Sequence, residues 1–334
     1  MRGITPQIFC SIDGRDVSSL VFPRLVSATV TDGTGIESDG VNITLDNAGD
    51  MIDRPKKNSI LIFGGGYKET GGPKLFGTYS IEDAEKVGPK RHLIVIARAG
   101  APGDKLKEKK NRAFDDKTVQ DIVGQVASDA GLKPAVDPDL AAIKIPFRAQ
   151  LNESDMHLLT QLGQRLGAMP VMKDGHLVFA RKGKGISISG QPLPVVEVGP
   201  NDLFAEDNAW RLRGCARAKY GTIRAYWHDP EETIRKKVEK VSGDGPVLEI
   251  PDLFQGEDEA KAAIDGHRNN QDREEEKLSL SLIGLETRQA EAKMKVDGLD
   301  RDADGEWSIE TVTHEFVGTD VYKNQIEAVR KEKT

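Results

Sequence analysis

Apolar and polar residues alternate with a period of two through most of the first hundred residues, and this pattern limits the fold more than any other feature. One such segment carries Val41, Ile43 and Leu45, and the turn-forming residues 46–50 follow it directly. Side chains of a strand point alternately to its two faces, so each segment has one apolar face to bury. Short strands joined by turns in this way predict an antiparallel barrel or a sandwich.

The same period returns in the last third of the chain. Leu278, Leu280 and Leu282 alternate with two serines, which indicates a strand with one buried face. Residues 257–275 before this strand have the composition of a polar helix. The weak apolar face of that helix consists of Ala260, Ala263 and Ile264.

The middle of the chain has a different pattern, which predicts a strand, a helix, a turn and a hairpin. Asn152 or Ser154 can cap the helix, because a short oxygen-bearing side chain accepts a hydrogen bond from the first turn. Gly167 is placed to end it. A stripe at helical spacing consists of Met156, Leu158, Leu159, Leu162 and Leu166. An earlier helix should begin at Thr118 and end at Gly131.

These patterns predict a mainly β protein with an α/β insertion. We expect two antiparallel, barrel-like domains that bracket an α/β domain. The first barrel-like domain should span residues 1–103, the α/β domain 104–198, and the second barrel-like domain 199–334, with a helical or loop insertion around 229–276.

Composition excludes several classes of protein. A length of 334 residues is enough for two or three domains with ample cores. No apolar run is long enough for a transmembrane helix. A net charge of -7 argues against nucleic-acid binding by the chain as a whole.

A basic segment between Trp210 and Trp227 is the clearest candidate surface. Its basic side chains are Arg211, Arg213, Arg217, Lys219 and Arg224. If the segment forms one strand, these side chains should project together. Mixed with aromatic residues, they could hold single-stranded nucleic acid, or they could form a subunit interface or a solvated face. Because the whole chain is acidic, we favour the subunit interface.

Residues 300–305 have the pattern D-x-D-x-D-G, which is the beginning of a calcium-binding loop. Asp300, Asp302 and Asp304 are therefore candidate metal ligands. The twelfth position should be a bidentate Glu but is Thr311, so an exposed acidic hairpin tip is the favoured interpretation. We predict no cofactor for the chain.

Two other clusters have simpler interpretations. The glycines at 64–66 and 71–72 lie between strand-like segments, which favours a flexible loop over a phosphate-binding turn. Glu153, Asp155 and His157 should splay apart on a helix, so capping and surface roles explain them better than catalysis. No nucleophile, base and acid recur at catalytic spacing, and we predict that the chain is not an enzyme.

The helical segment in the middle of the chain resembles the late control gene D proteins of contractile-tailed phages, which are baseplate hub proteins. The residues that carry the resemblance are Gln150, Glu153, Ser154, Asp155, Leu158, Leu159, Leu162, Gly167, Ala168, Asp174, Gly175, Leu177, Val178 and Phe179. Further similar residues flank this segment at Ser38, Asp39 and Pro55, and in the stretch 304–309.

The resemblance implies a structural protein of the virion tail baseplate, made and assembled in the cytoplasm of the bacterial host. Such hubs are homotrimers in which each subunit supplies two barrel-like tube domains, so that three chains form a pseudo-sixfold ring. The ring would adapt the sixfold tail tube to a threefold spike and leave a channel through which DNA passes during ejection.

The resemblance also implies partners. These would be further copies of the chain, the spike or needle protein, the tail tube protein, baseplate wedge proteins and the tape-measure protein. Because no spike segment follows Thr334, we expect the spike to be a separate chain rather than part of a type VI hub–spike fusion. The hub of a type VI-like or bacteriocin particle, a cell-wall hydrolase at the tail tip and a host-binding module are the alternatives.

Overall fold

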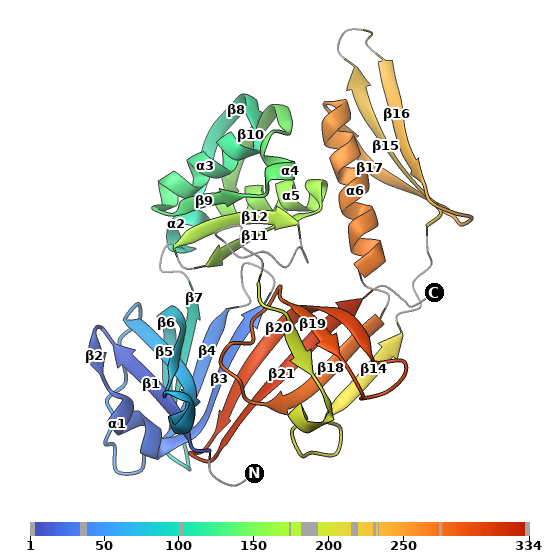
Figure 1. The fold of residues 1–334 in the computed structure, drawn as a ribbon. Helices are drawn as coiled ribbons and strands as arrows, with labels where there is room; N and C mark the ends of the chain where they lie inside the picture. Colours follow the sequence, from blue (N-terminus) through green and yellow to red (C-terminus); the bar gives the residue numbers. More distant parts are fainter. Residues whose placement is uncertain are drawn as a thin grey trace. The chain divides into compact units, whose positions relative to one another are not determined.

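The computed structural model describes residues 4–33, 39–99, 103–173, 175–181, 193–214, 220–229, 232, 234–273 and 276–330 (Figure 1). The chain divides into two compact units. Unit 1 consists of Met1–Ala101, Pro192–Arg213 and Leu278–Ala328. Unit 2 consists of Pro102–Gln191, Gly214–Lys277 and Val329–Thr334. The segment 199–334, which we expected to form the second barrel-like domain, therefore contributes to both units.

Unit 1 is built on one sheet of thirteen strands. Its main path runs β14-β18-β21-β20-β3-β4-β7-β6-β5-β1-β2, and β19 pairs with both β20 and β13. The strands are β1 (Pro6–Ile12), β2 (Arg15–Asp16), β3 (Leu25–Gly33), β4 (Gly40–Asp46), β5 (Ile60–Tyr67), β6 (Lys74–Val87), β7 (His92–Ala99), β13 (Val196–Val198), β14 (Trp210–Gly214), β18 (Glu276–Ile283), β19 (Lys293–Val296), β20 (Gly305–Val317) and β21 (Val321–Arg330). Short helical turns lie between them at α1 (Ser18–Val21), η1 (Phe22–Arg24), η2 (Lys68–Thr70) and η3 (Pro200–Asp202).

The sheet of unit 1 has two hydrophobic cores. One core contains side chains of β1 and β3–β7, and the other contains side chains of β13 and β18–β21. The long strand β20 belongs to both, because Trp307 and Ile309 lie in the second core whereas Phe316 lies in the first. Antiparallel pairing of β20 with β3, from Thr311↔Gly33 to Val317↔Ser27, joins the halves in one sheet.

The prediction of a mainly β protein is confirmed. The two β regions, however, do not form the separate barrels that we expected. Among the described strands no sheet closes on itself, and the two β regions share one sheet instead of forming two separate ones. The reason is the length of β20, because a 13-residue strand reaches beyond its own core and pairs with β3.

The prediction of a flexible loop at Gly64, Gly65 and Gly66 is wrong. All three glycines are buried in β5, which pairs with β1 and β6. A Cβ atom on Gly65 would overlap the ring of Phe316, and one on Gly64 would overlap the backbone of Lys74. The glycines are therefore places where other groups approach the strand closely.

Buried polar side chains also link the two halves of unit 1. The Tyr67 hydroxyl on β5 donates to the Tyr322 carbonyl oxygen on β21 at 3.1 Å. The Tyr322 hydroxyl lies 2.8 Å from Nδ1 of His314, and Nε2 of His314 lies 3.2 Å from the Arg288 carbonyl oxygen. Asn324 Nδ2, an amide nitrogen that can only donate, lies 2.9 Å from the same Nδ1, so Nδ1 accepts and the ring is neutral.

Unit 2 combines three small sheets with helices. Its elements are α2 (Gly103–Lys107), β8 (Lys109–Thr118), α3 (Val119–Ala130), β9 (Lys133–Val136), α4 (Pro138–Ala141), β10 (Lys144–Ser154), α5 (Asp155–Leu166), β11 (Ala168–Lys173), β12 (His176–Arg181), β15 (Thr222–Asp229), β16 (Ile234–Val241), β17 (Val247–Phe254) and α6 (Glu257–Arg273). The sheets are β10-β8, β11-β12-β9 and β16-β15-β17. Helix α6 packs on β16-β15-β17 through Ala260, Ala263 and Ile264, which form the apolar face predicted from the sequence.

Local signals explain where the helices of unit 2 begin and end. Thr118 caps α3 in a reciprocal capping box with Asp121, and Gly131 ends that helix with a left-handed φ of 75°. The Ser154 hydroxyl accepts from the His157 N–H, and Gly167 ends α5 with a φ of 64°. These predicted caps are confirmed. In the described part of the chain, no helix combines the length and apolar character needed to cross a membrane.

Candidate functional site

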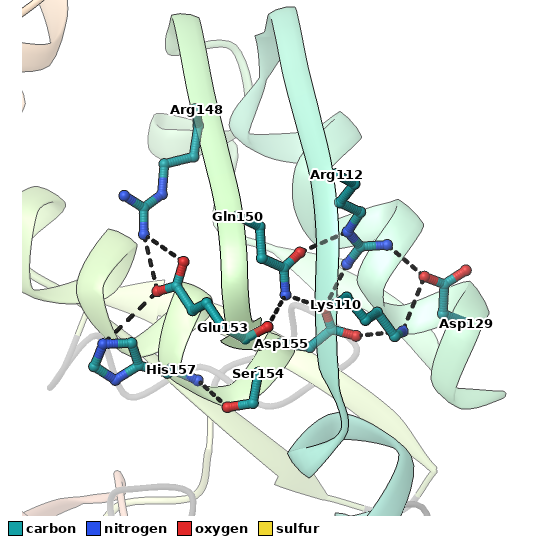
Figure 2. A network of polar contacts seen from close by, with 9 residues as sticks. All are labelled: Lys110, Arg112, Asp129, Arg148, Gln150, Glu153, Ser154, Asp155 and His157. Carbon is teal, nitrogen blue, oxygen red and sulfur yellow. Dashed lines mark hydrogen bonds and ion pairs between the residues drawn. The ribbon is translucent and has the colours of Figure 1, made fainter.

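The junction of β10 with α5 gathers several charged side chains into one network of polar contacts (Figure 2). Asp155 is fully buried there. Its carboxylate accepts from Lys110 Nζ at 2.7 Å and from Arg112 Nη2 at 2.5 Å. Gln150 holds the same group in place, since its Nε2 donates to Asp155 Oδ1 at 2.8 Å and its Oε1 accepts from Arg112 Nε at 2.6 Å.

Asp129 on α3 completes this network from the other side. Its Oδ2 lies 2.5 Å from Arg112 Nη1 and 3.3 Å from Lys110 Nζ. Partial burial would raise the pKa of Asp129, but hydrogen bonds and charge from the two cations outweigh it and the pKa is lowered. Burial would likewise lower the pKa of Lys110, yet the two carboxylates raise it. Two cations and two carboxylates therefore neutralise each other and tie β8 to α3 and α5.

A second, more open cluster lies on the other side of β10. Arg148 Nη2 donates to both carboxylate oxygens of Glu153 at 3.0 Å and to Gln161 Oε1 at 2.6 Å. His157 Nε2 lies 3.7 Å from Glu153 Oε1 (Figure 2). Asp155 points away from this pair, as the spacing predicted. Glu153 and His157 nevertheless approach each other, because Glu153 lies at the end of β10 and His157 lies in the first turn of α5, on either side of the Ser154 cap.

A hollow of about 540 Å³ opens beside this second cluster. It is lined by Lys107, Lys109, Arg148, Ala149, Leu151, Asn152, Glu153, Ser154, His157 and Gln161. Strand β10 has a bulge between Gln150 and Glu153, where its pairing with β8 shifts register. Asn152 in the bulge has a left-handed φ of 49°, and Leu151 is 73% exposed. The hollow thus combines an apolar side chain, basic groups and the edge of a strand.

The residues of this junction fall within a region that matches a known family. Residues 91–319 match the family described as phage tail baseplate hub (GPD). The chain belongs to this family. Hub proteins of the family are parts of the virion tail baseplate, which is the place that the sequence resemblance implied for this chain.

Two phage proteins are similar to the hub in sequence. The chain is 30% identical over 226 residues to the probable baseplate hub protein of Escherichia phage P2, which covers 67% of this chain and 57% of that protein. It is 28% identical over 238 residues to the probable baseplate hub protein of Escherichia phage 186, covering 70% and 59%. The hub thus spans less than two thirds of the length of these relatives.

Solved structures share the fold over almost the whole hub. The 43 kDa tail protein of prophage MuSo2 from Shewanella oneidensis superposes with a TM-score of 0.69 at 14% identity, covering 97% of this chain and 98% of that one. A tail protein from Neisseria meningitidis MC58 gives 0.69 at 12% identity, covering 97% and 96%. An Escherichia coli component of the type VI secretion system gives 0.56 at 11% identity, covering 97% and 77%.

The basic residues that we predicted as an interface of the hub do not lie on one strand. Arg211 and Arg213 are exposed on β14, which ends the large sheet of unit 1. Arg224 lies on β15 of unit 2, where it pairs with Glu239 at 3.0 Å and Glu249 at 3.1 Å. Residues Arg217 and Lys219 lie outside the described residues. The shared strand face is a wrong prediction, because β14 and β15 belong to different sheets.

The acidic loop of the hub directs its carboxylates to its own backbone. Asp304 accepts from the N–H groups of Gly298 at 3.0 Å and Leu299 at 2.9 Å, and Asp300 accepts from the N–H of Asp302 at 2.9 Å. Among the described residues, no three His, Cys, Asp or Glu side chains gather as a metal site would require. These hydrogen bonds stabilise the turn in its observed form.

The sequence pattern did not point to Lys110, Arg112 or Asp129. Lys110 and Arg112 are two apart on β8, so they share a face, but their carboxylate partners come from α3 and α5. Asp155 lies 43 residues from Arg112 in the sequence. The surface role predicted for Asp155 is wrong, because its carboxylate is fully buried and paired with Lys110 and Arg112.

Proposed function

We propose that this hub acts as a homotrimer, which forms a ring between the sixfold tail tube and a threefold spike. The single observation that supports this most is the construction of unit 1, where two hydrophobic cores share one sheet through β20 and β3. Three copies of a chain with two such halves present six similar modules around one axis. A symmetric ring of this kind closes on itself and needs no further chemistry.

We also propose the partners that such a ring requires. The threefold side would contact a separate spike or needle protein, and the sixfold side would contact the tail tube protein. Baseplate wedge proteins would surround the ring, and the tape-measure protein and DNA would pass through its channel. Solved chains of the same fold include a type VI secretion component described as similar to phage tail proteins and one from a Francisella PdpA–VgrG complex, which supports a place beside a spike.

In this proposal the hub acts through its surfaces and not through catalysis. The most buried carboxylate of the α/β region, Asp155, is covered by two cations and cannot reach a substrate. Glu153 beside the hollow is held by Arg148. A glycan hydrolase uses two positioned carboxylates that face an open cleft. Asp155 and Glu153 do not form such a pair.

The test is the mass and symmetry of the assembled protein. Light scattering on the purified chain should give about three times the mass of one chain, which is 36.5 kDa, and a larger complex with three copies of the chain when the spike and tube proteins of the same particle are added. Electron microscopy of the same sample should show a ring with threefold symmetry. A particle that remains monomeric or has another symmetry with both partners present would exclude the ring. Clearing of cell wall in a zymogram would contradict a purely structural role.

A further inference from the structure

The edge of β10 that borders the hollow has no partner strand among the described residues, although the Gln255 side chain occupies it at Phe147. Strand β10 pairs with β8 on one side, and no other described strand pairs with its second edge. The N–H of Phe147 donates to Gln255 Oε1 at 2.9 Å, so it points away from β8. Main-chain groups alternate in direction along an antiparallel strand. The N–H and carbonyl of Ala149 therefore face the open edge, next to the hollow that Ala149 helps to line.

The bulge in β10 presents an apolar side chain at this edge. Leu151 and Asn152 have no partner in the register of β8. The Asn152 N–H donates to Asn111 Oδ1 at 2.7 Å, which holds its left-handed conformation in place. Bulges commonly reposition side chains at functional edges. Here the bulge leaves Leu151 73% exposed, and Phe147 on the same strand is 50% exposed.

The charge around the hollow is opposite in sign to that of the chain. Lys107, Lys109 and Arg148 line it, and Glu153 is its one acidic lining residue. Within the described part of the chain, neither Lys107 nor Lys109 forms an ion pair, whereas Glu153 is neutralised by Arg148 (Figure 2). The two lysines therefore supply unbalanced positive charge, although the whole chain has a net charge of -7.

We propose that this hollow binds an extended, acidic segment of a partner protein, which adds to the open edge of β10 as a further strand. Main-chain hydrogen bonds to β10 would hold the segment, as in other cases of strand addition. An apolar side chain of the segment would pack on Leu151, and its carboxylates would lie near Lys107 and Lys109. The site lies in unit 2 and does not depend on the ring that we propose from unit 1.

A peptide-binding experiment on the full chain tests this proposal. The probe is a fluorescein-labelled peptide of eight residues in which glutamate and valine alternate. Fluorescence anisotropy should show saturable binding that weakens between about 50 mM and about 200 mM salt, because exposed charges are screened. A peptide with lysine in place of glutamate should bind at least tenfold more weakly. A fully N-methylated version, which cannot donate main-chain hydrogen bonds, should also lose at least tenfold.

Variants of the protein separate this site from nonspecific binding. Leu151→Asp and the double variant Lys107→Glu/Lys109→Glu should each weaken binding at least tenfold. Leu75→Asp is the matched control, because Leu75 is 64% exposed on β6, in unit 1, and it should bind as the wild type does. Circular dichroism and melting curves should be unchanged in all three, since these side chains are exposed.

Several results would overturn the proposal. If the lysine peptide binds as tightly as the glutamate peptide, the site has no preference for acidic segments. If the N-methylated peptide binds as tightly, the segment does not bind by strand addition. Unchanged affinity of Leu151→Asp, or no binding to the wild type at all, would remove the site. Self-association of the wild type that Leu151→Asp abolishes would show that a second copy, not a partner protein, occupies the hollow.

Discussion

The aromatic ring of Phe316 on β20 lies directly over Gly65 on β5, where no side chain could fit. Phe316 is fully buried, and Phe63 contacts it edge-on with 6.4 Å between the ring centroids. This contact joins a strand of the first half of unit 1 to one of the second half. A residue that looked like part of a flexible loop is thus a packing position between the two halves.

Replacing Gly65 with alanine should destabilise unit 1. A Cβ atom would overlap the Phe316 ring, and overpacking of this kind costs about 1–3 kcal/mol of unfolding free energy. Urea denaturation followed by hydrogen exchange in unit 1 peptides measures this change. Gly124→Ala on α3 is the matched control, because a Cβ there has open space and should stabilise its helix by up to about 1 kcal/mol. Equal stability of Gly65→Ala and wild type would show that the ring moves freely.

His314 should make unit 1 less stable in acid. Burial lowers the pKa of His314 to about 4, whereas an unfolded chain has a histidine pKa of about 6.5. As pH falls below 6.5 the unfolded chain binds the proton first, so stability is full above that pH and declines towards pH 4. The loss is on the order of 3 kcal/mol.

The measurement that tests His314 is the unfolding free energy of unit 1 between about pH 4 and about pH 6.5, in wild type and in His314→Gln. The variant cannot bind the proton, so its stability should depend less on pH even if it is lower throughout. His267 in unit 2 also has a pKa lowered by burial, so the readout must come from unit 1 peptides alone. An identical pH slope in both proteins would rule out His314 as the group responsible.

Asp155→Asn should destabilise unit 2 strongly. The change leaves Lys110 and Arg112 without their buried carboxylate. The expected loss is about 3 kcal/mol, at the lower end for a broken buried pair, because both cations keep some contact with water. Asp129→Asn is the control, since Asp129 is 37% exposed and should cost about 1 kcal/mol or less. Chemical denaturation read in unit 2 compares the two, and equal losses would contradict the central role of Asp155.

Arg211 and Arg213 should matter for assembly if the hub forms a ring through the end of its large sheet. Charge reversal in Arg211→Glu/Arg213→Glu should lower the trimer fraction at least tenfold at a fixed protein concentration, measured by light scattering. Arg224→Gln is the comparison, because Arg224 is already occupied by Glu239 and Glu249 within its own sheet. Its assembly should equal that of wild type. If the double variant forms trimers as wild type does, the interface between subunits does not include β14.

The sequence by itself determined the local elements of this hub. The caps at Thr118 and Ser154, the helix ends at Gly131 and Gly167, and the half-buried strand at residues 278–282 all follow from neighbouring residues. These signals act within a few positions, so they can be recognised without knowing the fold. The resemblance to the hub family also rested on such a local segment.

Only the tertiary structure decided how distant segments meet. The pairing of Ala28 with Phe316 merges the two β regions into one sheet, and Asp155 acquires its cations from a strand more than forty residues away. Neither contact has a periodic signal, because each depends on which surfaces remain to be buried after the local elements have formed. Arg211 and Arg224 lie in different sheets for the same reason. Helix α6 buries its apolar face on β15, and β15 belongs to the sheet β16-β15-β17 and not to the sheet that contains β14.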